Sequence, residues 1–319
     1  MALQQGRDLH IDAVLSNIMV GRRPVNGIVN DLVPVVTVGK QSNVYYKSNY
    51  KEHLLWTPGL ANMAKGAKSR EVYFTVSSDT YYAQHYGLGG FWYDEDVANE
   101  DDPIRLRQRT ATRVTDALLL DYEARVAGIA NTASNVSTTT HVATAWSNVT
   151  GSRPYSDLVN YVEAFRQITT LRPNVLILPE QVATKVRRSD EVRDILFGDR
   201  GGVATDQQIA SLIKVDRILV PELFVNTAGP AETAIGSGTV APVWGNKAFL
   251  AYVGDLTSQD EQDTWISAFR WTNPLFAVPW AIRAFPHNDE RGSQKIEASY
   301  YQVEKIISAD LGMAIDSVI

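Results

Sequence analysis

The chain has 319 residues, of which 45% are hydrophobic and 21% charged, and its formal net charge is −6. This composition is typical of a soluble globular protein with a sizeable core and more than one lobe. The negative balance argues against a general electrostatic attraction for nucleic acid or for an anionic membrane. The absence of cysteine excludes disulfides, thiolate metal sites and cysteine nucleophiles, and it fits a reducing cytoplasm. We find neither a run of apolar residues long enough to cross a bilayer nor a signal-peptide pattern.

The first 31 residues contain a short amphipathic pattern, with Ile11, Val14, Leu15 and Ile18 at helical spacing. A helix of about 11 residues is marginally stable alone, so we expect it to dock on its own domain or on a neighbour. Residues 31–38 read as a strand, which Pro34 restricts to a sheet edge or a strand start.

The stretch from residue 40 to residue 70 is basic and poorly periodic. Its only acid is Glu52, and its bases are Lys40, Lys47, Lys51, Lys65, Lys68 and Arg70. Strand-like residues at 44–46 and 72–76 flank it, which predicts a hairpin whose tip leaves the body of the protein. A solvated surface loop is the alternative interpretation.

An aromatic, glycine-rich stretch follows at residues 81–93. Its Gly87-x-Gly89-Gly90 is the nearest approach to a phosphate-binding loop, but aromatics follow it in place of a helix start, which favours an aromatic-flanked turn. A run of acids comes next: Asp94, Glu95, Asp96, Glu100, Asp101 and Asp102. These acids suit the positive end of a helix, and they also offer a counter-surface for the basic stretch.

Residues 101–131 predict one long helix. Asp101-Asp102-Pro103 has the pattern of an aspartate cap followed by proline in the first turn. Leu119, Tyr122, Val126, Ile129 and Ala130 form an apolar stripe, and Asp121 can pair with Arg125 on the solvent side. A helix of this length, roughly 43 Å, needs a sheet packed along it to bury its apolar stripe. An ordinary long helix of an α+β enzyme fits the same pattern.

The segment from residue 134 to residue 272 predicts helices around a small sheet. Ser156, Ser189 and the Thr205-x-x-Gln208 capping box mark three helix starts, and a further helical piece spans residues 180–188. Strands are expected at 175–178, 218–221 and 248–253; the first two are apolar enough to be buried. The last residues alternate as an antiparallel hairpin, with Trp280, Ile282 and Ala284 before a polar turn and Ile296, Ala298 and Tyr300 after it. We expect that hairpin to lie against the long helix.

The sequence offers little for catalysis. None of the 5 histidines has the spacing of a helical metal pair, and no nucleophile elbow or Walker loop occurs. Carboxylates are abundant, yet no glycosidase pair stands out. We therefore expect no enzyme, no metal and no organic cofactor.

The order of these parts resembles the major capsid proteins of tailed bacteriophages, with the Hong Kong 97-type fold. The passages that carry the resemblance are residues 172–179 (RPNVLILP), 213–220 (IKVDRILV) and 243–248 (VWGNKA). It implies an α+β fold with an N-terminal arm (1–31), an E-loop hairpin with its strands (32–98), a spine helix of the peripheral domain (99–133), an axial domain (134–272) and closing strands of the peripheral domain (273–319). Encapsulin shells share this fold.

The resemblance implies a shell built from pentamers and hexamers of this chain around double-stranded DNA. Portal proteins and scaffold or decoration proteins are the implied partners, and the virion, assembled in the host cytoplasm, is the implied location. An encapsulin-like compartment and, less favoured, a carboxylate-dependent hydrolase are the alternatives. The two charged runs predict an inter-subunit contact between Lys47, Lys51, Lys65, Lys68 and Arg70 of one copy and Asp94, Glu95, Asp96 and Glu100 of the next.

Overall fold

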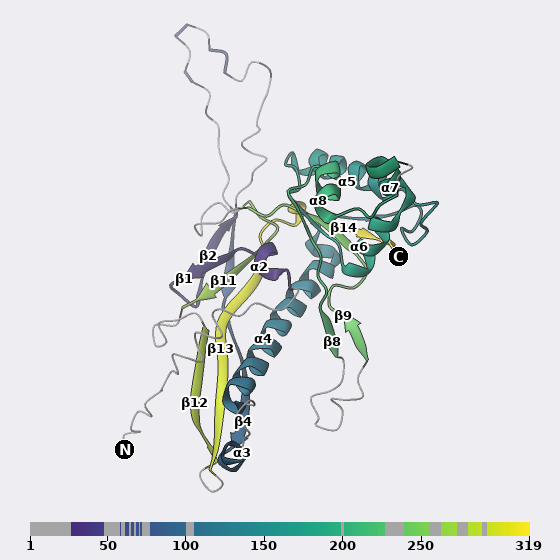
Figure 1. The fold of residues 1–319 in the computed structure, drawn as a ribbon. Coiled ribbons are helices and arrows are strands. Elements are labelled where there is room, and N and C mark those ends of the chain that lie inside the picture. The colour runs from purple at the N-terminus through teal and green to yellow at the C-terminus, as the bar shows by residue number, and fades with distance from the viewer. Residues whose placement is uncertain are drawn as a thin grey trace.

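The computed structural model describes residues 27–47, 58, 61–63, 65–66, 68–69, 71, 77–99, 105–198, 201–226, 239–254, 263–272, 280–288 and 292–319. The predicted helix near the N-terminus, the predicted strand at 72–76 and the polar turn after Asn288 lie wholly or mostly outside these residues. The described chain is elongated, with a long helix running between two sheets (Figure 1).

The helical elements are α2 (Val29–Leu32), α3 (Asp94–Ala98), α4 (Leu106–Asn131), α5 (Pro154–Thr169), α6 (Glu180–Arg188), α7 (Asp190–Phe197) and α8 (Asp206–Ile213), with 3₁₀ turns η2 (Ala133–Asn135) and η4 (Ala309–Leu311). The strands of the first half are β1 (Val35–Val38), β2 (Ser42–Lys47), β3 (Ser77–Tyr82), β4 (Gln84–Tyr93), β5 (Thr138–His141) and β6 (Val175–Ile177). Those of the second half are β7 (Arg217–Leu219), β8 (Phe224–Asn226), β9 (Val240–Pro242), β10 (Ala248–Ala251), β11 (Ile266–Trp271), β12 (Trp280–Asn288), β13 (Ser293–Ile306) and β14 (Gly312–Asp316).

Two five-stranded sheets organise these elements. The first runs β1-β11-β13-β12, with β4 also paired to β13, and the second runs β5-β14-β10-β6-β7. Strands β2 and β3 form a separate two-stranded ribbon, as do β8 and β9. The C-terminal β14, from the expected closing segment, lies in the second sheet, whereas β11, from the expected axial domain, lies in the first. Each sheet therefore contains strands from both sides of the expected boundary at 272/273. The division into domains itself stays a prediction.

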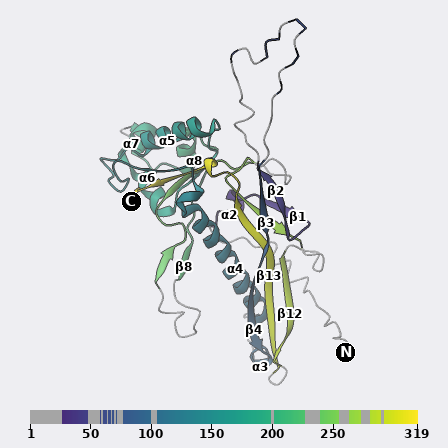
Figure 2. The ribbon, with the colours of Figure 1, turned by 180° about the vertical axis from the view of Figure 1, so that it is seen from behind.

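Helix α4 packs on both sheets, and this explains its length. Its first half contributes Ala111, Val114, Leu118 and Leu119 to a core with the β12–β13 hairpin. Its second half contributes Tyr122, Val126, Ala127 and Ala130 to a core with α2, Trp265 and one face of the second sheet. Helices α5 to α8 cover the other face of that sheet. The apolar stripe and the docking of the terminal hairpin are therefore confirmed, and Figure 2 shows the same arrangement from behind.

The predicted start of the long helix is wrong. Helix α4 begins at Leu106, after Arg105 in the left-handed conformation with φ 43°, so Pro103 is not its first-turn proline. The acids Asp94, Glu95 and Asp96 instead form the first turn of the separate helix α3. They therefore complement the dipole of α3 and not that of α4.

Gly87, Gly89 and Gly90 lie within strand β4, so both the phosphate loop and the aromatic-flanked turn are wrong. Residues 84–93 of β4 pair antiparallel with 293–302 of β13. Gly90 is required by the close approach of α4: a Cβ there would lie 2.5 Å from Thr110 Cγ2 and 3.0 Å from Val114 Cγ2. A glycine in a strand thus marks the close approach of a helix.

Several predictions between residues 154 and 220 are confirmed, and others are corrected. Ser189 caps α7, and Thr205 with Gln208 forms the capping box of α8. Strand β6 is buried on both faces, as expected of its apolar run. However, β7 is an edge strand and only partly buried. Helix α5 begins at Pro154, so Ser156 is not its cap; Glu191 of α7 accepts hydrogen bonds there from Tyr155 N (2.8 Å) and from the Ser156 hydroxyl.

Near the start of the described chain, Asp31 lies in helix α2 and not in a strand. Strand β1 follows directly after Pro34 and occupies the edge of the first sheet, parallel to β11. The restriction that Pro34 places on the strand is therefore confirmed. Strands β2 and β3 pair antiparallel over Ser42–Lys47 and Ser77–Tyr82, so the basic stretch does connect two paired strands.

Candidate assembly surfaces

The predicted contact residues lie on separate parts of the fold. Lys47 ends β2 and forms an ion pair of 3.2 Å with Asp79 of β3 in its own chain. Lys65 and Lys68 are exposed and lie between β2 and β3 in the sequence. Asp94, Glu95 and Asp96 are exposed on α3. Lys51, Arg70 and Glu100 are outside the described residues. The hydrogen bond from Thr80 N and the ion pair with Lys47 hold the pKa of Asp79 below its ordinary value.

Lys47 and the acidic residues of α3 lie far apart within one chain. Strands β3 and β4 follow one another, and at about 3.3 Å per residue the stretch from Ser77 to Asp94 spans roughly 50 Å. Because Ser77 is paired with Lys47, the same separation applies to Lys47 and Asp94. Figure 1 shows β2 and α3 at opposite ends of the long strands. A contact between Lys47 and Asp94 would therefore have to join two copies.

A buried carboxylate fastens α4 to two other parts of the chain. Glu123 is fully buried and accepts hydrogen bonds from Ile28 N (3.1 Å), Val29 N (3.2 Å) and the Trp244 indole N–H (2.8 Å). Burial raises the pKa of Glu123, and its three hydrogen bonds oppose that shift. Glu123 is not among the residues predicted from the sequence. Its position on the apolar face, between Leu119 and Val126, was the available signal, since a carboxylate there must be buried with partners.

Arg125 joins α4 to the first sheet. The predicted ion pair between Asp121 and Arg125 is confirmed, but Arg125 does not face solvent as expected. Its guanidinium donates to the Tyr300 hydroxyl (2.8 Å) and to Glu304 (3.2 Å), and it lies 3.6 Å from the centre of the Tyr86 ring. Arg125 therefore bridges the helix to β4 and β13, because its long side chain reaches past the apolar stripe.

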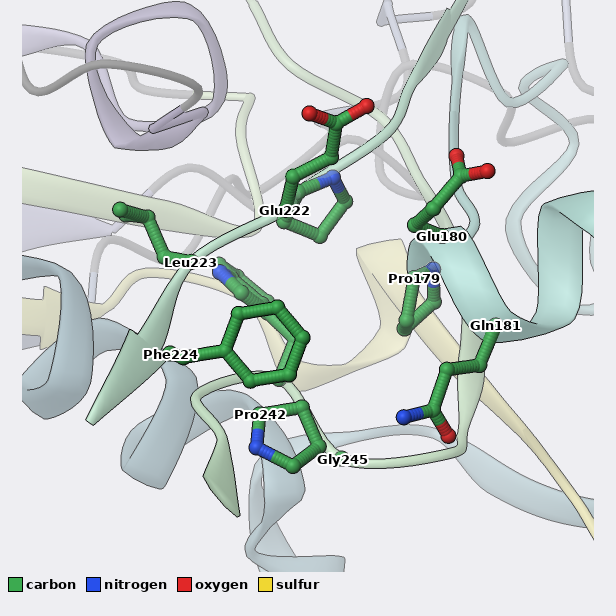
Figure 3. Close-up of a pocket in the computed structure, with 10 residues that line it drawn as sticks. Pro179, Glu180, Gln181, Glu222, Leu223, Phe224, Pro242 and Gly245 are labelled. Atoms are coloured by element: carbon green, nitrogen blue, oxygen red, sulfur yellow. The ribbon is translucent and has the colours of Figure 1, made fainter. Parts of the chain in front are cut away.

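A small hollow lies where the β8–β9 ribbon leaves the second sheet (Figure 3). Its lining residues are Pro179, Glu180, Gln181, Pro221, Glu222, Leu223, Phe224, Pro242, Trp244 and Gly245. Glu180, one of its two carboxylates, is bound to Arg187 at 3.1 Å. Proline, aromatic and leucine side chains make up six of its ten lining residues, so the hollow suits an apolar side chain better than acid–base chemistry.

Nowhere in the described ranges do three or more acidic or histidine side chains gather closely enough to hold a metal ion. Similarly, the part of the chain that the structure describes has no helix with the length and apolar character needed to cross a membrane.

Comparison with known proteins decides the family. The model of a family described as phage capsid protein matches residues 77–278. This chain belongs to the phage capsid protein family. The match spans α3 to α8, the β8–β9 ribbon and four of the five strands of the second sheet, so the resemblance stated from the sequence is confirmed.

Individual proteins agree along nearly the whole chain. The major capsid protein of Pseudomonas phage JBD67 is 24% identical over 315 residues, which cover 97% of each chain. The crystal structure of a phage-related protein from Bordetella bronchiseptica RB50 has a TM-score of 0.73 at 19% identity and covers 98% of this chain and 99% of its own. The capsid of cyanophage P-SCSP1u has a TM-score of 0.64 at 13% identity and covers 99% and 92%. The mixed α+β fold is thus that of phage capsid structures.

Proposed function

We propose that this protein is the major capsid protein of a tailed phage, whose copies assemble through pentamers and hexamers into an icosahedral head around double-stranded DNA. The observation that carries the proposal is the family match over residues 77–278, supported by a capsid fold that extends along 99% of the chain. The work of such a protein is association and not catalysis, so it needs no substrate or cofactor. Portal and scaffold or decoration proteins are its expected partners, in a virion assembled in the host cytoplasm.

In this proposal, each part of the fold has a role in the shell. Residues 1–31 form the arm, the β2–β3 hairpin is the base of the E-loop, and α4 is the spine helix between a peripheral and an axial domain. The full E-loop segment is 32–98, the spine segment 99–133, the axial domain 134–272 and the closing segment 273–319. The contacts of Glu123 and Arg125 support the role of α4, because they join that helix to α2, to the Trp244 loop and to the first sheet.

The proposed inter-subunit contact places the basic side chains of one copy on the acidic segment of the next. The basic side consists of Lys47, Lys51, Lys65, Lys68 and Arg70, and the acidic side of Asp94, Glu95, Asp96 and Glu100. The separation of roughly 50 Å between Lys47 and Asp94 within one chain supports it, since that pair cannot form internally. Lys47 contributes least, because Asp79 already pairs with it. Exposed pairs are each worth about 0–1 kcal/mol, but many act together in a shell.

Electron microscopy of the expressed protein tests the proposal. Closed shells, or shells formed after the phage's scaffold and portal proteins are co-expressed, are the expected result. Phage particles that contain this chain and protect double-stranded DNA from nuclease would support the head assignment. Shells filled with a cargo protein in place of DNA would indicate a compartment of the encapsulin kind, and monomers under all conditions would contradict assembly.

A further inference from the structure

The β8–β9 ribbon presents an apolar face without cover in the described chain. Phe224 is paired with Pro242 and Asn226 with Val240, so these four side chains share one face of the ribbon. Phe224 is 52% exposed and Val240 63% exposed, whereas Val225 and Ala241 on the other face are partly buried. The hollow in Figure 3 continues this face, since Phe224 and Pro242 line both.

The segment that contains the ribbon carries little charge. Residues 223–243 include a single charged residue, Glu232, although 21% of the whole chain is charged. Proteins usually protect exposed strand edges with charges, and the centres of protein interfaces are depleted of them. A two-stranded ribbon alone is at best marginally stable in water, and β8 and β9 pair with neither five-stranded sheet. Burial of Phe224 and Val240 by a partner would therefore stabilise the ribbon.

The base of the ribbon is rigidly held. Val243 N donates to Leu223 O at 3.0 Å, and Trp244, the next residue, donates to Glu123 of α4 at 2.8 Å. Both Phe224 and Pro242 are consequently fixed relative to the long helix. A fixed apolar face beside a preformed hollow is a surface for a regular contact, because little conformational entropy remains to be lost on binding.

We propose that the apolar face of the β8–β9 ribbon and the adjoining hollow form a subunit contact, and that the partner is a second copy of this chain. The inference rests on the proposed function. A shell protein is surrounded by its own copies whenever it assembles, so neighbouring subunits are always available to cover this face. The contact is heterologous, with the ribbon of one copy on a different surface of the next, as ring closure requires. It is separate from the proposed charged contact on α3.

The absence of cysteine gives a direct test. In Val240→Cys, the single thiol is labelled with a photoactivatable maleimide, and labelled subunits are co-assembled with ¹⁵N-labelled wild-type subunits. After irradiation, mass spectrometry identifies the peptides attached to residue 240. The matched control is Val203→Cys, since Val203 is an exposed valine outside the ribbon. The expected result is a peptide carrying ¹⁵N, attached at residue 240 only in assembled particles. Attachment only within the same chain, or only to a scaffold or decoration protein, would overturn the proposal.

A second measurement uses Val240→Asp, with Val203→Asp as its control. The subunit should unfold at the wild-type temperature, because Val240 is exposed in the monomer, but the fraction assembled at equal concentration should fall about tenfold or more, since a carboxylate enters a dry contact. Wild-type assembly of Val240→Asp would contradict the ribbon contact and leave the proposed capsid function intact. A failure of the wild-type protein to form shells would instead count against the capsid function itself.

Discussion

The indole N–H of Trp244 and the carboxylate of Glu123 form a hydrogen bond of 2.8 Å between two buried side chains 121 positions apart in the sequence. Glu123 also accepts from the backbone N–H groups of Ile28 and Val29. One side chain of α4 thus fixes both the start of the described chain and the base of the β8–β9 ribbon.

Removal of this carboxylate should destabilise the unassembled subunit. In Glu123→Ala, three buried N–H donors lose their acceptor, so we expect the free energy of unfolding to fall by roughly 2–4 kcal/mol. Urea denaturation of the monomer measures it. Glu123→Gln keeps one acceptor oxygen and should cost less. A loss below half a kcal/mol in the alanine variant would mean that water replaces the carboxylate.

The pH dependence of stability should carry the signature of Glu123. Because burial raises its pKa in the folded state, the folded protein holds this proton more tightly than the unfolded chain does. Protonation of Glu123 therefore stabilises the folded protein. This stabilisation is fully present below the unfolded pKa of about 4.3, and it is lost as pH rises through the folded pKa. Wild-type protein should lose stability relative to Glu123→Gln across that window. Urea midpoints of both proteins from pH 4 to pH 8 would show it, and parallel curves would contradict it.

The spacing between β4 and α4 should depend on Gly90. In Gly90→Ala, the new methyl group would lie 2.5 Å from Thr110 Cγ2, so helix and strand must separate, at a cost of about 1–3 kcal/mol. Thr110→Ala should recover part of this loss in the double variant. The control is Gly128→Ala on the same helix, where no atom lies within 4 Å and alanine should stabilise by about 0.5–1 kcal/mol. Equal effects at both positions, measured by thermal unfolding, would refute the packing argument.

Reversal of charge should block assembly if the proposed contact exists. Lys65→Glu with Lys68→Glu should prevent shell formation, and adding Asp94→Lys with Asp96→Lys should restore it, because the pairs return with opposite signs. The control reverses Arg188 and Lys214, two exposed bases elsewhere. Light scattering over a series of salt concentrations measures assembly, which should weaken in the wild type as salt screens the pairs. Normal assembly of the first variant at low salt would contradict the charged contact and leave shape and apolar contact as the means by which the hairpin binds.

The sequence alone determined those features whose physics is local. The Ser189 helix cap and the Thr205–Gln208 capping box identified the starts of α7 and α8. The apolar stripe identified α4 and its buried face. Alternation identified the β12–β13 hairpin. In each case, the hydrogen bonds or the periodicity that define the element involve residues close together in the chain, so their pattern is visible without a fold.

Only the tertiary structure decided the features that depend on distant neighbours. Gly90 resembled part of a turn until α4 was placed against it, and Glu191, 35 residues away, displaced Ser156 from its expected capping role. The structural role of Glu123 depends on hydrogen bonds from Ile28 and Trp244, which are remote in sequence. Strand β14 joined the second sheet through partners far along the chain. Long-range packing chooses between conformations that local preferences leave nearly equal in free energy, and so it decides the final contacts.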